Sequence, residues 1–239
     1  MSSVEDRKPG RRARLRAQTT AEIKRIALEH MAEQGADAIS LRAIAREMDM
    51  SGSAIYSYFD TRDDLISELI SDVYTDLVTA AETARDTVPE DDPGGRITAW
   101  GEALRTWSLA NPQGFRLIYG DPVAGYRAPA EGPAPEAAKR ACLGLTGLVA
   151  AVWPSARALQ DDPTVQWSDF SADFMAKVRE QYPDLPPAAV ALALRVWGRM
   201  HGLVALEMHG HLGPQAHDPA RLYRRELLDL VRSLGLPGS

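Results

Sequence analysis

The sequence predicts an all-α protein in which a small N-terminal three-helix domain is followed by a larger helical domain. Apolar residues recur at helical spacing along most of the 239 residues, for example at Leu41, Ile44 and Met48. Capping residues followed by proline, as in Asp218-Pro219, mark helix starts. No stretch shows the alternation of apolar and polar residues that is typical of a strand. We therefore expect a chain built from helices joined by turns and loops.

Composition limits the class of protein. The hydrophobic fraction of 45% suits one large or two small domains with a sizeable core. No run of about 18 apolar residues is free of charges, so no membrane span is expected. The N-terminus carries charges where a secretory signal needs an apolar stretch. Cys142 is the only cysteine, so no internal disulfide can form, and a cytoplasmic location is expected.

Charge is divided unevenly along the chain. Residues 1–62 hold 11 Lys and Arg against 9 Asp and Glu, whereas residues 63–239 hold 16 against 24, within an overall net charge of −6. Six of the basic residues lie in residues 1–20. An acidic body with a basic end is the polarity expected of a DNA-binding regulator.

The basic N-terminus is expected to be a flexible arm over residues 1–17. Such an arm can follow phosphates or enter a minor groove, or it can be a solvated tail without a role, and the sequence leaves both open. Thr19-x-x-Glu22 has the form of a capping box and predicts a helix from there to about Gln34. Gly35 is the expected stop of that helix.

Two short helices with a tight turn are predicted within residues 40–59. Ser51 is the expected N-cap of the second helix, in which Ile55 and Phe59 lie four residues apart and face the core. Tyr56 lies about 100° further round the helix than Ile55, which favours a phosphate contact over core packing. This arrangement is typical of a helix-turn-helix, and we predict a DNA-binding domain over residues 18–62.

The motif has a family resemblance. The run Ile39-Ser40-Leu41-Arg42-x-Ile44-Ala45, then Met50-Ser51, Ile55-Tyr56-x-Tyr58-Phe59 and Arg62-x-x-Leu65, resembles the TetR family of bacterial transcriptional regulators. By position, the resemblance implies a DNA face made of Arg42, Gly52, Ser53, Ala54, Tyr56, Ser57, Tyr58 and Arg62.

The implied roles differ within that face. Arg42 and Arg62 match positions that usually meet phosphates. Gly52 and Ala54 stand where other members often carry longer polar side chains. Base reading is therefore expected from the serines of the segment, from backbone approach, or from DNA shape.

The rest of the chain is expected to be helical over residues 63–239. Thr61-x-x-Asp64 predicts a long helix to about Thr87, ended by the Pro- and Gly-rich residues 89–95. The remaining predicted helices span residues 96–110, 112–119, 136–153, 164–182, 188–208 and 219–234.

All five tryptophans lie in this C-terminal body. Their ordinary role is core filling, but with the neighbouring aromatic residues they could line an apolar cavity. The resemblance implies such a cavity, in which a small-molecule effector binds. The predicted ligand-binding residues are Trp100, Trp107, Phe115, Tyr119, Phe170, Phe174, Trp197 and His201. His201 could instead be satisfied by a neighbouring protein group.

The predicted helix at 188–208 is apolar over most of its surface, and it carries small residues that allow close approach. With the last helix it suits a four-helix interface in a homodimer, as the resemblance also implies; both could also be core helices of a monomer. A dimer supplies the two recognition helices, about 34–36 Å apart, that a palindromic operator on double-stranded DNA requires.

Other functions lack support in the sequence. There is no glycine-rich phosphate loop, nucleophile elbow or zinc signature, so no enzyme, metal or cofactor is predicted. The expected function is a TetR-type regulator, a repressor whose operator binding is released by a small, largely apolar ligand. The alternative is a ligand-independent architectural protein that binds DNA through the same helix-turn-helix.

Overall fold

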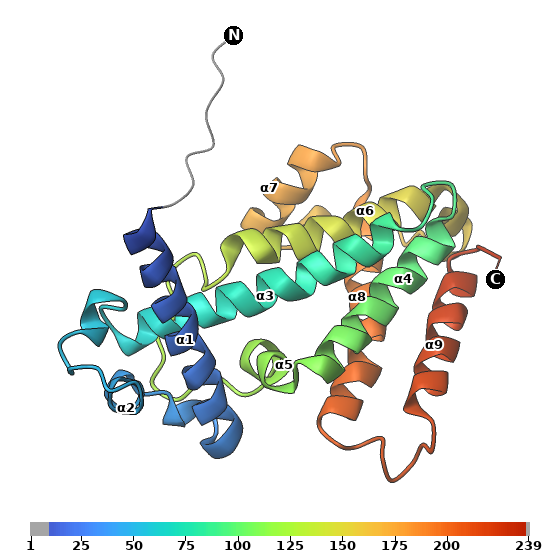
Figure 1. The fold of residues 1–239 in the computed structure, drawn as a ribbon. Helices are drawn as coiled ribbons and strands as arrows, with labels where there is room; N and C mark the ends of the chain where they lie inside the picture. The colour runs from blue at the N-terminus through green and yellow to red at the C-terminus, as the bar shows by residue number, and fades with distance from the viewer. Residues whose placement is uncertain (1–9, 238–239) are drawn as a thin grey trace. The chain divides into compact units, whose positions relative to one another are not determined.

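A computed structural model describes residues 10–237, and these form helices, turns and loops without any strand (Figure 1). The prediction of an all-α protein is confirmed. The helices are α1 (Arg11–Gln34), α2 (Leu41–Glu47), α3 (Arg62–Asp86), α4 (Pro93–Ala110), α5 (Pro112–Tyr119), α6 (Pro135–Gln160), α7 (Ala172–Gln181), α8 (Pro187–Met208) and α9 (Pro219–Ser233). Short 3₁₀ turns occupy Ala36–Ala38, Ile55–Ser57 and Trp167–Asp169.

The chain divides into two compact units. The first contains residues up to Ile70 together with Gln113–Pro133, and the second contains Ser71–Pro112 and the residues from Ala134 onward. These bounds differ from the predicted division at residue 62. The start of α3, all of α5 except its first residue, and the loop that follows α5 belong with the first unit.

Apolar side chains from α1, α2, the turn Ile55–Ser57, the start of α3 and α5 contribute to the core of the first unit. Gly35, with φ of +88°, follows the last residue of α1 as expected. The buried apolar residues are Ile23, Ile26, Ala27, Met31, Ile39, Leu41, Ile44, Ala45, Ile55, Phe59, Leu65, Ile66, Leu69, Phe115, Leu117 and Val123.

Helix α1 begins at Arg11, eight residues before the predicted start. Thr19 lies inside the helix, where its hydroxyl donates to the carbonyl of Leu15 at 3.1 Å. Between Gly10 and Gly35 the chain has no glycine or proline, and its alanines and arginines favour helix. Residues 11–17 of the predicted flexible arm are therefore helical, and residues 1–9 lie outside the described residues.

Close approaches of α4 to its neighbours organise the second unit. A Cβ placed at Gly101 of α4 would lie 2.6 Å from Leu227 of α9, and one at Gly144 of α6 would lie 2.6 Å from Trp100. The hydroxyl of Tyr223 donates to the carbonyl of Gly101 at 3.0 Å in the same buried contact. These glycines let the helix backbones pack at distances that a side chain would prevent.

Two of the predicted helices, 136–153 and 164–182, have different bounds in the structure. Helix α6 continues through Pro154 to Gln160, because Val152 and Ala156 are buried on either side of this exposed proline and hold the helix to the core. The predicted helix at 164–182 is replaced by a 3₁₀ turn and α7. Ser171 caps α7 by accepting a hydrogen bond from the amide of Phe174 at 3.3 Å.

Helices α6 and α8 are long and apolar enough to cross a membrane when judged by length and composition alone. This is weak evidence for a span, because a core helix of a soluble protein passes the same test. Both helices pack against each other within the second unit, where Val149 and Val152 of α6 and Val196 and Val204 of α8 are buried. Core packing accounts for the part of their apolar surface that is buried.

Candidate nucleic-acid interface

Helix α2 buries one face and exposes two arginines on the other. The side chain of Ser40 accepts a hydrogen bond from the amide of Ala43 and starts the helix. Leu41 and Ile44 are buried in the first unit, whereas Arg42 and Arg46, four residues apart, are exposed. The i, i+4 spacing places both guanidinium groups on the same side of the helix.

A tight turn follows α2. Asp49 has a φ of 51°, a left-handed conformation that aspartate tolerates better than most residues. The amide of Met50 donates back to the carbonyl of Ala45 at 2.8 Å and closes the turn. The turn brings the segment from Ser51 to Tyr58 back beside α2.

The segment after the turn is not the α-helix that was predicted. Its only helical part is the 3₁₀ turn Ile55–Ser57. Ser51 does act as a cap, since its Oγ accepts from the amide of Ala54 at 3.2 Å, and the Oγ of Ser57 donates to the carbonyl of Ala54 at 2.7 Å. Serine hydroxyls that bond to the nearby backbone compete with the α-helical pattern, and Gly52 weakens it further.

The core contacts of this segment are as predicted. Ile55 and Phe59 are 0% and 2% exposed, and the amide of Phe59 donates to the carbonyl of Ile55 at 3.2 Å. Tyr56 is 41% exposed and points away from that core.

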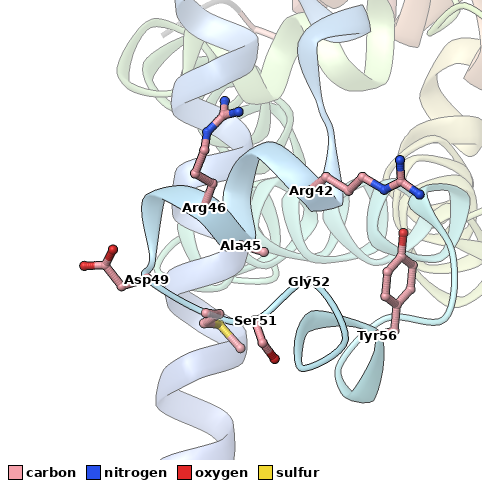
Figure 2. A pocket seen from close by; sticks show the side chains of 8 residues that line it. Arg42, Ala45, Arg46, Asp49, Ser51, Gly52 and Tyr56 are labelled. Atoms are coloured by element: carbon pink, nitrogen blue, oxygen red, sulfur yellow. The ribbon is translucent and has the colours of Figure 1, made fainter.

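An open hollow of about 740 Å³ separates α2 from this segment (Figure 2). Arg42 and Tyr56 extend along the same end of the hollow in Figure 2, and Arg46 and Asp49 lie toward the other end. The lining residues are Arg42, Ala45, Arg46, Asp49, Met50, Ser51, Gly52 and Tyr56. Three of the predicted DNA-facing residues, Arg42, Gly52 and Tyr56, are thus brought together.

The hollow has a net positive lining. The lining contains two arginines, Arg42 and Arg46, against one carboxylate, that of Asp49, and neither arginine forms an ion pair among the described residues. Gly52 is exposed, and a Cβ placed there would have no heavy atom within 4 Å. Uncompensated guanidinium groups beside open backbone are suited to phosphate oxygens.

The other predicted residues of the segment lie beside the hollow and do not line it. Ser53 is exposed, with its hydroxyl 3.2 Å from that of Ser51, and Ser57 is exposed as well. Ala54 is half-buried, as is Tyr58. Their contacts with DNA stay predictions.

Arg62 forms hydrogen bonds with backbone carbonyls that the sequence did not indicate. Its Nε donates to the carbonyl of Ile39 at 2.8 Å, and its Nη1 donates to the carbonyl of Ala124 at 3.2 Å. The guanidinium therefore joins Ile39, two residues before α2, to the loop after α5, within the first unit. The phosphate contact expected of Arg62 stays a prediction, and it would compete with these two hydrogen bonds.

Three more hydrogen bonds fasten that loop, residues 120–134. The carboxylate of Asp37 accepts from the amide of Ala124 at 3.0 Å, and Asp63 accepts from the amide of Arg127 at 3.2 Å. The hydroxyls of Ser67 and Tyr126 lie 2.8 Å apart. No local sequence pattern points to these contacts, which join residues 59 to 87 positions apart.

Two further basic residues lie at this interface: Arg46 was not predicted to face DNA, and Arg16 was expected only as part of the flexible basic arm. Nη2 of Arg16 donates to the carbonyl of Ser57 at 2.7 Å, and its guanidinium carbon lies 4.9 Å from the ring centre of Tyr58. Two features of the sequence could have identified them: Arg16 belongs to the basic run at 11–16, and Arg46 lies four residues after Arg42, on the same side of the helix.

The predicted ligand-binding residues are dispersed. Trp100 and Trp107 are buried in the second unit, where the indole of Trp107 donates to Asp76 at 2.7 Å. Phe115 and Tyr119 belong to the first unit, with ring centres 5.2 Å apart.

The remaining candidates lie in the second unit. Phe170 and Phe174 are half-buried neighbours, with ring centres 5.9 Å apart. Trp197 is 41% exposed, and its ring centre lies 5.9 Å from that of His201, whose pKa is lowered by burial. A single pocket for all eight candidates stays a prediction.

Two hollows of the second unit are lined by other residues. One, of about 350 Å³, is bordered by Arg85, Arg96, Leu143, Leu148 and Tyr182, among others. The second lies on α8 and α9, where Gly198 and Gly202 adjoin Leu206 and Leu222, which are 43% and 41% exposed. This is the face on which a second copy was expected to pack.

No group of three His, Cys, Asp or Glu residues within 10–237 is arranged to hold a metal ion. Cys142 is half-buried, and burial raises the pKa of its thiol, which lowers the fraction present as the reactive thiolate.

Comparison with known proteins relates the chain to bacterial regulatory proteins. Residues 25–69 match the family model of bacterial regulatory proteins of the tetR family, and residues 97–230 match a tetracyclin repressor-like C-terminal domain. The chain is 32% identical over 206 residues to the HTH-type transcriptional regulators Rv1816 of Mycobacterium tuberculosis (strain ATCC 25618 / H37Rv) and Mb1846 of Mycobacterium bovis. These matches cover 85% of this chain and 86% of each relative.

Solved structures share the fold. The regulatory protein SCO4313 is 35% identical, with a TM-score of 0.73 over 94% of this chain and 100% of that chain. A bacterial regulatory protein in the tetR family from Rhodococcus RHA1 is 19% identical, with a TM-score of 0.59 over 92% of this chain and 98% of that one. The second likeness concerns the fold alone.

Proposed function

Because the chain belongs to the TetR family of bacterial transcriptional regulators, we propose that it is a homodimeric repressor that a small, largely apolar ligand releases from a palindromic operator. The observation that carries the proposal is the hollow between α2 and the segment from Ser51 to Tyr58. It combines two uncompensated arginines, an exposed tyrosine and open backbone at Gly52.

Each group in the hollow has a role in the proposal. Arg42, Arg46 and Tyr56 bind phosphate oxygens and fix the protein on the duplex. The exposed hydroxyls of Ser53 and Ser57 then lie where they can meet base edges. Because Gly52 lacks a side chain, the backbone of the segment can come close to the groove.

The dimer rests on the outer face of α8 and α9. Leu206 and Leu222 are exposed large apolar residues there, and Gly198 and Gly202 have no heavy atom near the position of an added Cβ. Small residues beside exposed leucines suit close helix packing against a second copy. In a dimer, two reading segments about 34–36 Å apart match successive major grooves.

Ligand release is the regulatory part of the proposal. A ligand that binds the second unit better in the DNA-free arrangement lowers DNA affinity by its coupling free energy. Couplings of about 1–3 kcal/mol change affinity about 5- to 150-fold. The alternative is an architectural protein that uses the same hollow on DNA of any sequence and has no effector.

A titration of the purified protein on the DNA upstream of its own gene, against a shuffled fragment at two salt concentrations, separates the two. The repressor proposal predicts tight binding to the upstream fragment only, by a species with the mass of a dimer in light scattering. Equal binding to both fragments that collapses with salt would support the architectural alternative.

The dimer is tested with a matched pair of variants. Leu222→Asp places a charge on the proposed interface and is expected to give a folded monomer with weakened operator binding. Leu159→Asp changes a leucine that is 65% exposed elsewhere in the second unit and should remain dimeric. Dimers of equal stability in both variants would show that this face is not the interface.

A further inference from the structure

The first turns of α1 meet the segment proposed to read DNA. Nη2 of Arg16 donates to the carbonyl of Ser57 at 2.7 Å, and the guanidinium lies over the ring of Tyr58 at 4.9 Å. Because Ser57 ends a 3₁₀ turn, its carbonyl has no α-helical partner to continue the segment. Arg16 thus supplies a charged donor at the end of the reading segment.

Charge compensation changes abruptly along α1. Arg11, Arg12, Arg14 and Arg16 are exposed, and none of them forms an ion pair with a carboxylate among residues 10–237. Further along the helix, Arg25 is held between Glu22 and Glu29. The uncompensated charge therefore lies on the part of α1 that reaches the reading segment.

Helical geometry separates these arginines into faces. Arg12 and Arg16 are four residues apart, so they lie on the same face and about 6 Å apart along the axis. Arg14 is two residues from each, about 200° round the helix, and points to the opposite side. The face that touches Ser57 and Tyr58 therefore carries Arg12 one turn beyond the contact.

We infer that this face of α1, with Arg12 and Arg16, is a second DNA-contacting surface that binds the phosphate backbone flanking the site of the reading segment. The inference rests on the proposed function and extends it to residues outside the helix-turn-helix. Arg16 has a double role. One of its five N–H groups holds the reading segment, and its charge adds to the attraction for phosphates. Arg12 binds the next phosphate along the strand.

The test is an anisotropy titration of the full-length variants Arg12→Ala, Arg14→Ala and Arg16→Ala on labelled duplexes over a salt series. The upstream fragment and a shuffled fragment of equal length are both used. Arg14→Ala is the matched control, since it removes the same charge from the same exposed helix on the other face. Circular dichroism checks that helix content is unchanged.

Loss of Arg12 is expected to weaken binding to both fragments about tenfold and to reduce the salt slope by about 0.9, the value for one phosphate contact. Loss of Arg16 should reduce the slope equally and also lower the preference for the upstream fragment. Arg16→Lys should keep the slope but not that preference, because lysine retains the charge without the planar stack on Tyr58. Arg14→Ala should bind like the wild type.

If Arg12→Ala and Arg16→Ala match Arg14→Ala at every salt concentration while the wild type binds the upstream fragment, the inference is wrong and the proposed function stands. If the wild type binds neither fragment, both fail. A loss that is equal for all three variants would also contradict the inference, because it would reflect overall charge and not a defined face.

Discussion

The position of Arg62 gives a prediction that separates two roles for one residue. A phosphate contact predicts that Arg62→Ala weakens DNA binding and leaves the protein equally stable. The hydrogen bonds to the carbonyls of Ile39 and Ala124, at 2.8 and 3.2 Å, predict a loss of stability instead. Hydrogen bonds from charged groups contribute about 1.5–3 kcal/mol each, and the longer, exposed one lies at or below that range. We therefore expect a local loss of about 2–4 kcal/mol.

Hydrogen exchange followed by mass spectrometry measures this loss where it occurs. Amides in residues 36–42 and 121–127 should exchange at least about 30-fold faster in Arg62→Ala, which corresponds to about 2 kcal/mol. Arg62→Lys should exchange nearly as fast, because an ammonium group cannot reproduce the fork that reaches both carbonyls. Arg116→Ala removes an exposed arginine of α5 and should leave exchange unchanged. Wild-type exchange rates in Arg62→Ala would show that the two hydrogen bonds of Arg62 do not stabilise these segments.

Three further changes test the second unit. Gly101→Ala places a Cβ 2.6 Å from the fully buried Leu227, so urea unfolding should show a loss of about 1–3 kcal/mol, and an unchanged midpoint would contradict the close packing. Glu207→Gln leaves Arg105 without its carboxylate at a site where the two side chains are 15% and 14% exposed, and should cost about 2–4 kcal/mol in the same assay. Burial lowers the pKa of His201, so the folded protein holds this ring neutral, and stability should fall as pH drops below the ordinary value of about 6.5. His201→Gln should weaken that acid dependence, which is measured as unfolding midpoints between pH 5 and 8.

Local patterns predicted the starts of α9 and α3 well. Asp218 caps α9 by accepting from the amide of Arg221 at 2.9 Å, and Thr61 and Asp64 exchange the hydrogen bonds of a capping box at the start of α3. Both partners of such a cap lie within one turn of helix, so they can be identified from neighbouring residues in the sequence.

The same signals failed where tertiary or neighbouring structure decided the outcome. Thr19 and Glu22 have the capping-box spacing, but the helix begins earlier because nothing interrupts the residues after Gly10. The helix predicted from residue 112 does begin at Pro112, but the side-chain amide of Asn111 donates to the carbonyl of Trp107 in the preceding helix α4. A side chain between two helices can bond to either, and only the fold decides.

The DNA face was predictable in part. The hollow joins Arg42 and Tyr56, which are 14 positions apart, through a turn that the motif itself encodes. The bond between Arg62 and Ala124 spans 62 positions, and that between Arg16 and Ser57 spans 41. Contacts at such separation depend on how whole segments pack, and no periodicity or capping rule reports them.

In the proposed function, the hollow between α2 and the segment from Ser51 to Tyr58 is the surface that binds DNA. The most direct measurement is the affinity of the Arg42→Ala/Arg46→Ala double variant for the upstream duplex over a salt series, beside the wild type and Arg116→Ala. If this hollow binds DNA, the double variant loses affinity at least about tenfold, and its salt slope falls by about 1.8, the value for two phosphate contacts, while Arg116→Ala binds like the wild type. A double variant with the affinity and slope of the wild type would show that DNA binds elsewhere on the protein.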